Sequence, residues 1–184
     1  AEEGILKGMY LFKENTSGNK LNVQLLGSGT IFREVEAAAD ILQEVYGVSS
    51  NVWSVTSFTE LRKEGLDAQR WNMLHPDEEA KVPYVTSLLR SHKSPVIAAT
   101  DYIKTHADQI RPFVRNHYTS LGTDGYGRSD SREKLRHCFD VDRYFITVAA
   151  LNALADKGMI GRSKVAEAIA RFNIDPEKVN PAIS

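Results

Sequence analysis

Residues 21–46 read LNVQLLGSGTIFREVEAAADILQEVY, and the architecture follows from the pattern that they carry. The segment begins with Leu21-Asn-Val-Gln-Leu-Leu26, which predicts a strand that is buried towards its end. Gly27-Ser-Gly-Thr30 breaks that strand. From Ile31 onward apolar residues recur every three or four positions, which predicts an amphipathic helix that ends at Gly47. A strand that passes directly into a helix is the unit from which α/β folds with parallel strands are built.

The same alternation continues on both sides of this unit. Short apolar segments predict four further strands, at residues 8–12, 51–55, 95–99 and 118–121. Helices are predicted from the capping box Ser57–Glu60, at residues 82–90 and 101–111, after a cap at Asp130, and at 142–157 and 163–172. The first two strands are joined too briefly for a parallel crossover, so we expect the first strand to run antiparallel at an edge. The pattern therefore predicts an α/β sandwich with a largely parallel sheet.

Length and composition narrow the function classes. The 184 residues are enough for one domain with its own core, and we treat residues 1–184 as a single domain. The net charge of −1 gives no overall attraction for nucleic acid, and no apolar run is long enough to span a membrane. The single cysteine, Cys138, excludes an internal disulfide and favours a reducing, cytoplasmic compartment. The chain opens at Ala1 without an initiator Met, so we expect a fragment of a longer multidomain enzyme.

The turn between the second strand and its helix is a candidate for weak anion binding, through Gly27, Ser28, Gly29 and Thr30. Backbone N–H groups and the helix dipole favour an anion at such a turn. A dinucleotide fingerprint would need a further glycine where Phe32 stands. The alternative is a tight turn that Ser28 or Thr30 caps. The sequence leaves both interpretations open.

Residues 122–132, the glycine loop, follow the last predicted strand and read GTDGYGRSDSR. Three glycines in six residues permit positive φ and close approach to another surface. Arginine suits an interface because its planar fork bonds carboxylates at two points. The candidate interface residues are Asp124, Gly125, Gly127, Arg128, Ser129, Asp130 and Arg132. The alternative is a structured turn in which the arginines pair locally with Asp124, Asp130 or Glu133.

No complete catalytic constellation is visible, so a self-contained hydrolase or oxidoreductase is not indicated. The histidines form no ligand pattern with each other or with cysteine, and no metal site is predicted; they are His75, His92, His106, His117 and His137. His137 and Cys138 are adjacent, and neighbours on a helix point about 100° apart, which disfavours a catalytic pair. The aromatic residues are not interleaved with a basic stripe, so nucleic-acid binding is not indicated either.

Several segments resemble one known family. They are Leu26-Gly-Ser-Gly-Thr-Ile-Phe-Arg-Glu-Val35, Val52-Trp-Ser-Val-Thr-Ser-Phe-Thr-Glu-Leu-Arg62, Arg70-Trp-Asn72, Pro95-Val-Ile-Ala-Ala-Thr-Asp-Tyr102, Asp124-Gly-Tyr-Gly-Arg-Ser-Asp-Ser-Arg132, Phe172-Asn-Ile174 and Lys178-Val-Asn-Pro181. Together they are similar to the C-terminal domain of the homodimeric, bacterial-type pyruvate dehydrogenase, the first component of its complex. A looser resemblance to the transketolase C-terminal domain underlies this one, and includes Tyr10-Leu-Phe-Lys-Glu14.

The resemblance implies a three-layer α/β/α sandwich around a five-stranded mixed sheet with the first strand antiparallel. It also implies a parent enzyme that uses thiamine diphosphate and Mg²⁺, decarboxylates pyruvate and passes the acetyl group to a lipoyl arm. The family's cofactor motif is Gly-Asp-Gly followed by Asn-Asn, whereas this chain has Thr123-Asp-Gly125 and no Asn-Asn. No catalytic, cofactor or metal residue is therefore assigned here, and we expect the fragment alone to be inactive.

Two hypotheses from different classes follow. The first is a non-catalytic structural and assembly domain of a pyruvate dehydrogenase in pyruvate metabolism and glycolysis. Its implied partners are the upstream domains of the same enzyme, the other subunit of the homodimer and the dihydrolipoyl acetyltransferase core. The second is a regulatory α/β module that binds a small ligand at Gly27–Thr30, because open α/β sheets bind ligands at strand ends.

Overall fold

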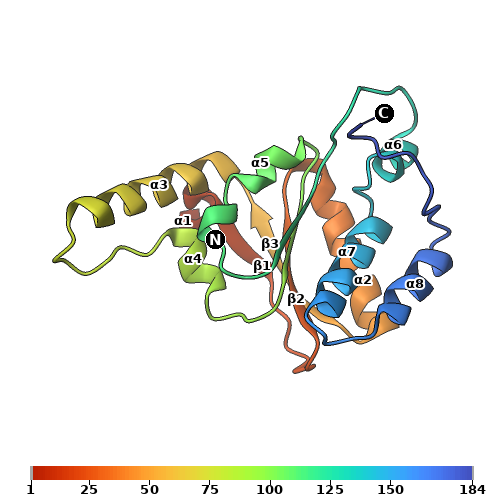
Figure 1. Cartoon of the computed structure of the whole chain (residues 1–184), viewed down its shortest axis with the longest axis horizontal. Coiled ribbons are helices and arrows are strands. Elements are labelled where there is room, and N and C mark those ends of the chain that lie inside the picture. The colour runs from red at the N-terminus through yellow and green to blue at the C-terminus, as the bar shows by residue number, and fades with distance from the viewer. Residues whose placement is uncertain (1, 184) are drawn as a thin grey trace.

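A computed structural model describes residues 2–183, and one mixed sheet forms the centre of the molecule (Figure 1). The strands of this region are β1 (Met9–Lys13), β2 (Asn22–Gly27), β3 (Ser49–Val55), β4 (Val96–Ala99) and β5 (Tyr118–Leu121). They lie in the order β1-β3-β2-β4-β5. β1 pairs antiparallel with β3, and the other pairs are parallel. The predicted mixed sheet with an antiparallel first strand is confirmed.

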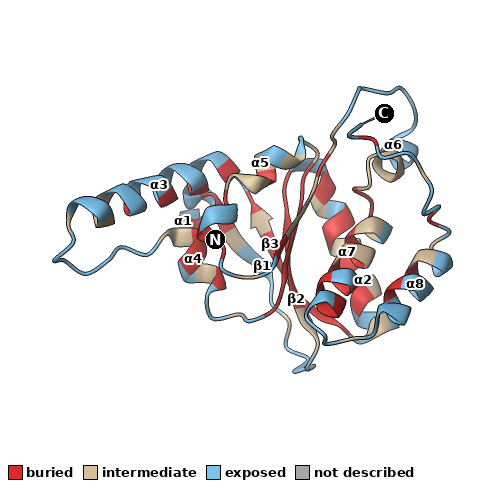
Figure 2. Cartoon of the chain, in the orientation of Figure 1, coloured by how far each residue is buried: buried red, intermediate tan, exposed pale blue. Residues whose placement is uncertain are grey.

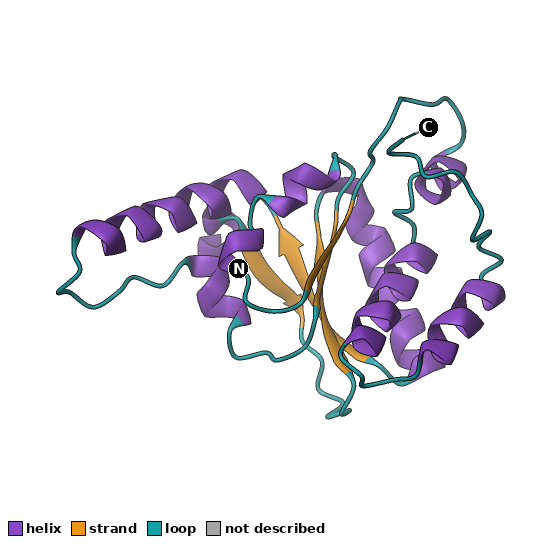
Figure 3. Ribbon diagram, viewed as in Figure 1, coloured by secondary structure: helices purple, strands orange, loops and turns teal. Residues whose placement is uncertain are grey.

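Helices cover both faces of the sheet, so the predicted three layers are present (Figure 3). The helices of the described region are α1 (Glu2–Lys7), α2 (Phe32–Tyr46), α3 (Phe58–Leu74), α4 (Tyr84–Leu89), α5 (Lys104–Asp108), α6 (Arg132–Cys138), α7 (Arg143–Asp156) and α8 (Arg162–Arg171), with 3-10 turns at Gly29–Ile31 and Arg111–Phe113. α2, α7 and α8 lie on one side, and α3, α4 and α5 on the other (Figure 1). No helix between residues 2 and 183 combines the length and apolarity needed to cross a lipid bilayer.

The sheet separates two apolar cores. Successive side chains of a strand point to opposite faces, so Leu25 packs into one core and Leu26 into the other. Both are fully buried, and each contributes roughly 2 kcal/mol through removal from water. β4 alternates in the same way, with Ile97 on the α2 face and Ala98 on the α3 face. Burial on both faces explains the continuous apolar sequence of β4 (Figure 2), whereas β2 also contains the buried Gln24, which accepts a hydrogen bond from Trp53 Nε1 at 2.8 Å.

Local capping signals fix several helix ends where the sequence predicted them. The hydroxyl of Ser57 accepts from the backbone N–H of Glu60 at 3.1 Å and starts α3. Gly47 ends α2 with a φ of +62°, the left-handed conformation that glycine adopts without strain. Asp142 caps α7 through bonds from the N–H groups of Tyr144 and Phe145. These helices begin and end close to their predicted limits.

Other predictions need correction. The short helix α1 was not expected; its sequence places acid in the first turn and Lys7 in the last. The helix expected over residues 101–111 is only α5, and Pro112 lies inside a 3-10 turn rather than after a helix. The cap of α6 is Ser131, which accepts from Lys134 N–H at 3.4 Å, and not Asp130. Asp130 bonds the N–H of Ser131 instead, one position too early to cap the helix.

Candidate functional site

The predicted site residues lie at the carboxyl ends of the parallel strands. The chain crosses from β2 to β3 over one face of the sheet and returns to β4 over the other, so the strand order reverses between β2 and β4. Ligands of open α/β sheets bind in the crevice outside such a reversal. Gly27–Thr30 directly follows β2, and Thr100 and Asp101 directly follow β4.

The carboxylate of Asp101 occupies the turn at Gly27–Thr30. Its Oδ2 accepts from the backbone N–H of Thr30 at 3.3 Å and from the Thr30 hydroxyl at 3.1 Å. Gly29 has a φ of +59°, and a Cβ built on it would lie 2.4 Å from Asp101 Oδ1. The chain therefore supplies its own negative group at the predicted anion position.

The expected caps are also absent from the described structure of this turn. Ser28 lies at the start of the 3-10 turn without a side-chain capping bond, and its hydroxyl donates to Thr100 Oγ1 at 2.9 Å. The residue before α2, Ile31, has no polar side chain to offer. Neither Ser28 nor Thr30 caps the helix, because both side chains bond to the segment that follows β4.

The first part of the glycine loop is tied to the connection between β4 and α5. The hydroxyl of Thr123 donates to the carbonyl of Asp101 at 2.7 Å, and Asp124 Oδ1 accepts from the N–H of Lys104 at 2.8 Å. A Cβ on Gly122 would lie 2.6 Å from the carbonyl oxygen of Tyr102. Glycine at position 122 is therefore required by close backbone packing.

The second part of the glycine loop faces outward. Tyr126 is 83% exposed, and residues 125–134 are all exposed. Gly125, with a φ of +104°, packs so closely on the C-terminal segment that a Cβ would overlap the carbonyl oxygen of Pro181. Of the local acids, Asp124 and Asp130 accept from backbone N–H groups, and no ion pair within residues 2–183 joins Arg132 to either of them or to Glu133. The local pairing alternative therefore does not account for Arg132.

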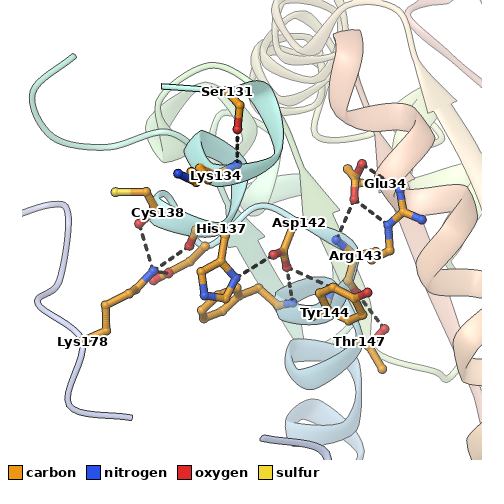
Figure 4. A network of polar contacts seen from close by, with 12 residues as sticks. Glu34, Ser131, Lys134, His137, Cys138, Asp142, Arg143, Tyr144, Thr147 and Lys178 are labelled. Atoms are coloured by element: carbon orange, nitrogen blue, oxygen red, sulfur yellow. Dashed lines mark hydrogen bonds and ion pairs between the residues drawn. The ribbon is translucent and has the colours of Figure 1, made fainter. Parts of the chain in front are cut away.

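A buried carboxylate, Glu34, helps to fix α6, the helix that follows this loop, and Figure 4 shows its contact with Arg143. Glu34 in the first turn of α2 is 4% exposed. It accepts from the backbone N–H, Nε and Nη2 of Arg143 at 3.0, 3.0 and 3.1 Å, and from Arg136 Nη1 at 2.9 Å. Burial raises the pKa of Glu34, but the bonds from Arg143 and the charges of both arginines outweigh it and lower the pKa below the ordinary value. Glu34 therefore joins α2, α6 and α7 as an anion.

The C-terminal segment is fastened to the other end of α6. Lys178 Nζ donates to the carbonyl oxygens of His137 at 2.6 Å and Cys138 at 3.0 Å, and to Asp140 Oδ1 at 2.5 Å. His137 turns its Nδ1 toward Asp142 Oδ2 at 2.9 Å rather than toward the thiol of Cys138 (Figure 4). Through these contacts Lys178 and His137 hold α6, α7 and the C-terminal segment together.

The two predicted sites line one cavity of about 380 Å³, which we call the arginine cavity. The turn contributes Thr30, and the glycine loop contributes Gly125, Gly127, Arg128 and Arg132. Its apolar lining and its remaining cation come from residues outside both predictions, namely Ile31, Leu135, Arg136, Phe139 and Val141. Asp101 and Thr123 also line the cavity. The predicted residues that do not line it are Gly27, Ser28 and Gly29 of the turn and Asp124, Ser129 and Asp130 of the loop.

A larger groove of about 1000 Å³ runs along α6, and we call it the basic groove. Its cationic lining residues are Arg128, Arg132, Lys134, Arg136, Arg143 and Lys178. Only the first two were singled out from the sequence. Lys134 and Arg136 follow Arg132 on α6, whereas Arg143 lies on α7 and Lys178 in the C-terminal segment, so no local pattern could have added these last two. Arg136 and Arg143 already pair with Glu34, and Lys178 pairs with Asp140, so a carboxylate-bearing partner would meet chiefly the exposed Arg132 and Lys134 at this surface.

The residues present do not fit a thiamine diphosphate and Mg²⁺ site. Asp124, the acid that remains of the expected Gly-Asp-Gly motif, bonds a backbone N–H group of its own chain. No group of three or more His, Cys, Asp or Glu residues between positions 2 and 183 is arranged to hold a metal ion. We therefore derive no chemical step through that cofactor here.

Comparison with known proteins gives consistent relatives. Residues 8–142 match the model of the transketolase-like TK C-terminal domain. The chain is 59% identical over 181 residues to the pyruvate dehydrogenase E1 component of Cupriavidus necator, a match that includes 98% of this chain and 20% of the relative. It is 55% identical over 185 residues to the Escherichia coli K12 protein of the same name, with 100% and 20% covered. The chain thus spans about a fifth of the length of these curated relatives.

Solved structures with the same fold are transketolases. The Campylobacter jejuni enzyme aligns with a TM-score of 0.52 at 19% identity, over 79% of this chain and 18% of that chain. The Pichia stipitis enzyme aligns with a TM-score of 0.55 at 16% identity, over 85% and 19%. At these identities the likeness extends to the fold alone.

Proposed function

Because this chain belongs to the family of transketolase-like C-terminal domains, we propose that it is the C-terminal domain of a pyruvate dehydrogenase E1 component and acts by packing. The single observation that carries this is identity of 59% across almost the whole chain to a protein of that name. In this proposal the full-length protein decarboxylates pyruvate with thiamine diphosphate and Mg²⁺ and transfers the acetyl group to lipoyl groups. The chemistry then resides in the four fifths of the relatives that this chain does not match.

The contacts of the glycine loop support the packing role. Its first residues are held by Asp101, Tyr102 and Lys104, so the loop is ordered before it meets a partner. Its exposed half then presents Arg128 and Arg132 at the rim of the arginine cavity. Ordering in advance lowers the entropy cost of association. We propose that this loop meets carboxylates of an upstream domain or of the other subunit of a homodimer.

The proposal extends to the surroundings of the full-length protein. It includes the cytoplasmic location that the single cysteine favours and a place in a multienzyme complex. The basic groove would offer a second surface of α6 to the dihydrolipoyl acetyltransferase core. Each of these assignments rests on the relatives and on exposed charge, and none requires a reactive group in this chain.

The test is the double substitution Arg128→Ala and Arg132→Ala in the full-length protein. We expect subunit association to weaken about tenfold or more and turnover to fall with it, because each arginine loses charge-assisted hydrogen bonds. Sedimentation velocity and pyruvate-dependent turnover measure the two effects. Arg115→Ala, an exposed arginine before β5, is the matched control. Unchanged sedimentation together with unchanged turnover in the double variant would overturn the proposal.

One observation favours a second function, a small-ligand regulatory module. The arginine cavity lies at the reversal of strand order and has a volume within the range of ligand sites. Asp101 weakens this candidate, because an incoming anion would have to displace a carboxylate that already bonds Thr30. If the chain is a ligand-binding module, inorganic phosphate, a nucleotide or acetyl-coenzyme A should raise its melting temperature. If it is a packing domain, none of these compounds should change the melting temperature.

A further inference from the structure

α3 extends well beyond the body of the molecule. Its residues Phe58, Leu61, Gly65 and Ala68 are buried, and Ala68 is the last of them. Residues 69–82 contain no buried position, and this part of the chain projects at the far left of Figure 1. Figure 2 shows the same region as almost entirely exposed. We call residues 66–83 the arm.

The arm is stiffened by contacts of its own. The side-chain amide of Asn72 donates to the carbonyl of Lys81 at 2.9 Å and accepts from its backbone N–H at 2.7 Å. The rings of Trp71 and His75 are stacked with centroids 4.4 Å apart, and Lys81 Nζ lies 4.6 Å from the Trp71 ring. The loop that follows α3 is thus folded back on the helix. Ordering these residues costs conformational entropy, although they fill no core of this domain.

The arm exposes apolar side chains. Met73 is 71% exposed and Leu74 is 51% exposed. Leu66 is also exposed, and because it precedes Met73 by seven positions both lie on the same side of α3. Single exposed apolar residues are common on protein surfaces, but a rigid projection that carries several of them is suited to docking. Asp77, Glu78 and Glu79 follow after His75 and Pro76, so we expect the complementary surface to be apolar with a basic rim.

The base of the arm adjoins the beginning of the described chain. The hydroxyl of Thr56 donates to the carbonyl of Ile5 at 2.8 Å, and Lys7 Nζ lies 5.0 Å from the centre of the Tyr84 ring. Leu6, which is 78% exposed, lines a cavity of about 450 Å³ together with Val82 of the arm. The arm and α1 therefore border one cavity, whose other lining residues are Lys7, Glu60, Glu64, Tyr84 and Ser87.

The occupant follows from the relatives. The chain matches a fifth of their length, and the matched family is a C-terminal domain, so most of the unmatched length precedes the match. That preceding polypeptide reaches this domain through α1, beside the arm. We propose that the arm docks on the domain that precedes this one in the same full-length polypeptide. The inference rests on the proposed function and names the partner of a second surface, separate from the glycine loop.

The test places a photoreactive amino acid in the full-length protein. When the photoreactive amino acid replaces Met73, irradiation should give a crosslinked product that migrates as a single subunit. Peptide mapping of this product should show position 73 joined to peptides of the preceding domain. At position 164 on α8, in place of the exposed Lys164, irradiation should give little product. Crosslinks from position 73 that join two subunits, or no crosslinks from it, would overturn the inference.

A third probe at Arg132 separates this inference from the proposed function. Crosslinks from position 132 without any from position 73 would support the proposed packing function and contradict docking of the arm. Crosslinks from position 73 but not from position 132 would support docking of the arm and contradict the proposed contact of the glycine loop. Silence at both positions would contradict both.

Discussion

Glu34 shows how a single buried carboxylate can connect three helices. It is nearly inaccessible to solvent, and a lone anion in that position would be strongly destabilising. Arg143 meets it with three N–H groups and Arg136 with one. Because Arg136 lies on α6, the pairing also positions the helix that follows the glycine loop.

Replacing Glu34 by Gln should lower the free energy of unfolding by about 3 kcal/mol, because both arginines lose their buried counter-charge. The native pKa of Glu34 is depressed, so its stabilising contribution is present above the ordinary value of 4.5 and is lost as pH falls through the native pKa. The Gln variant should lack that acid-dependent loss. Urea unfolding of wild type and variant between neutral pH and pH 3 measures both effects.

Glu44→Gln is the matched control, since Glu44 lies on the same helix and is exposed. Its effect should stay within about 0.5 kcal/mol. Equal effects of the two substitutions would show that the Glu34 pairing contributes nothing beyond an ordinary surface charge.

Asp101 illustrates a residue that sequence reasoning could not place. The donors at Gly27–Thr30 were visible as a local pattern, because a strand, a turn and a helix follow one another there. Their acceptor lies 71 positions later in the chain. Asp101 reaches these donors because β2 and β4 are neighbours in the sheet. Local periodicity of the sequence does not predict the order of strands in a sheet.

At the scale of elements, the glycine loop is a link between the sheet and the C-terminal segment. Gly122 packs on the backbone after β4, and Gly125 packs on Pro181. Lys178 fastens the same C-terminal segment to α6. The loop, α6 and that segment therefore form one packed unit at one end of the molecule (Figure 1).

Gly125→Ala should disrupt this unit. Alanine is strained at a φ of +104°, at a cost of about 1–3 kcal/mol, and its Cβ would overlap the carbonyl oxygen of Pro181. We expect faster amide hydrogen exchange in residues 174–183 and in the loop. Gly127→Ala is the control from the same loop, because its Cβ would meet no atom within 4 Å. Equal exchange in the two variants would be evidence against the proposed packing.

Most elements could be predicted because their signals are local. The sequence of β2 up to its glycine turn, the capping box at Ser57 and the terminal glycine at Gly47 each act within a few residues. The errors arose where a tertiary contact decides the outcome. Residues 101–103 contact the turn after β2 and the glycine loop, so α5 begins only at Lys104. α1 is short, and its position depends on packing against β1 that no periodicity reveals.

At the scale of the whole molecule, cationic side chains from several elements gather around two concave surfaces at one end of the domain. The arginine cavity and the basic groove draw their cations from the glycine loop, α6, α7 and the C-terminal segment. Composition gave no hint of this, because the net charge is only −1. The sequence indicated the loop as a candidate contact site, with a locally paired turn as the alternative, and the shape and charge of the surrounding groove emerged only from the assembled fold.

The isolated chain should neither bind thiamine diphosphate nor decarboxylate pyruvate. Asp124 is engaged with the backbone of Lys104, and the groups that activate the cofactor are implied to lie in other domains. Titration calorimetry with thiamine diphosphate and Mg²⁺ should show no saturable heat, and pyruvate should release no CO₂ above the buffer rate. The full-length protein is the positive control. Saturable turnover by the chain alone would refute the division of labour proposed here.

The alternation of Leu25 and Leu26 also bears on how the domain folds. β2 is paired on both sides, so a slip of one residue in its register would turn each leucine toward the wrong layer of helices. Each apolar core would then lose a buried leucine side chain through the same shift. The two apolar cores, one on each face of the sheet, are therefore coupled through strand β2. This coupling favours all-or-none folding over a state in which only one core is assembled.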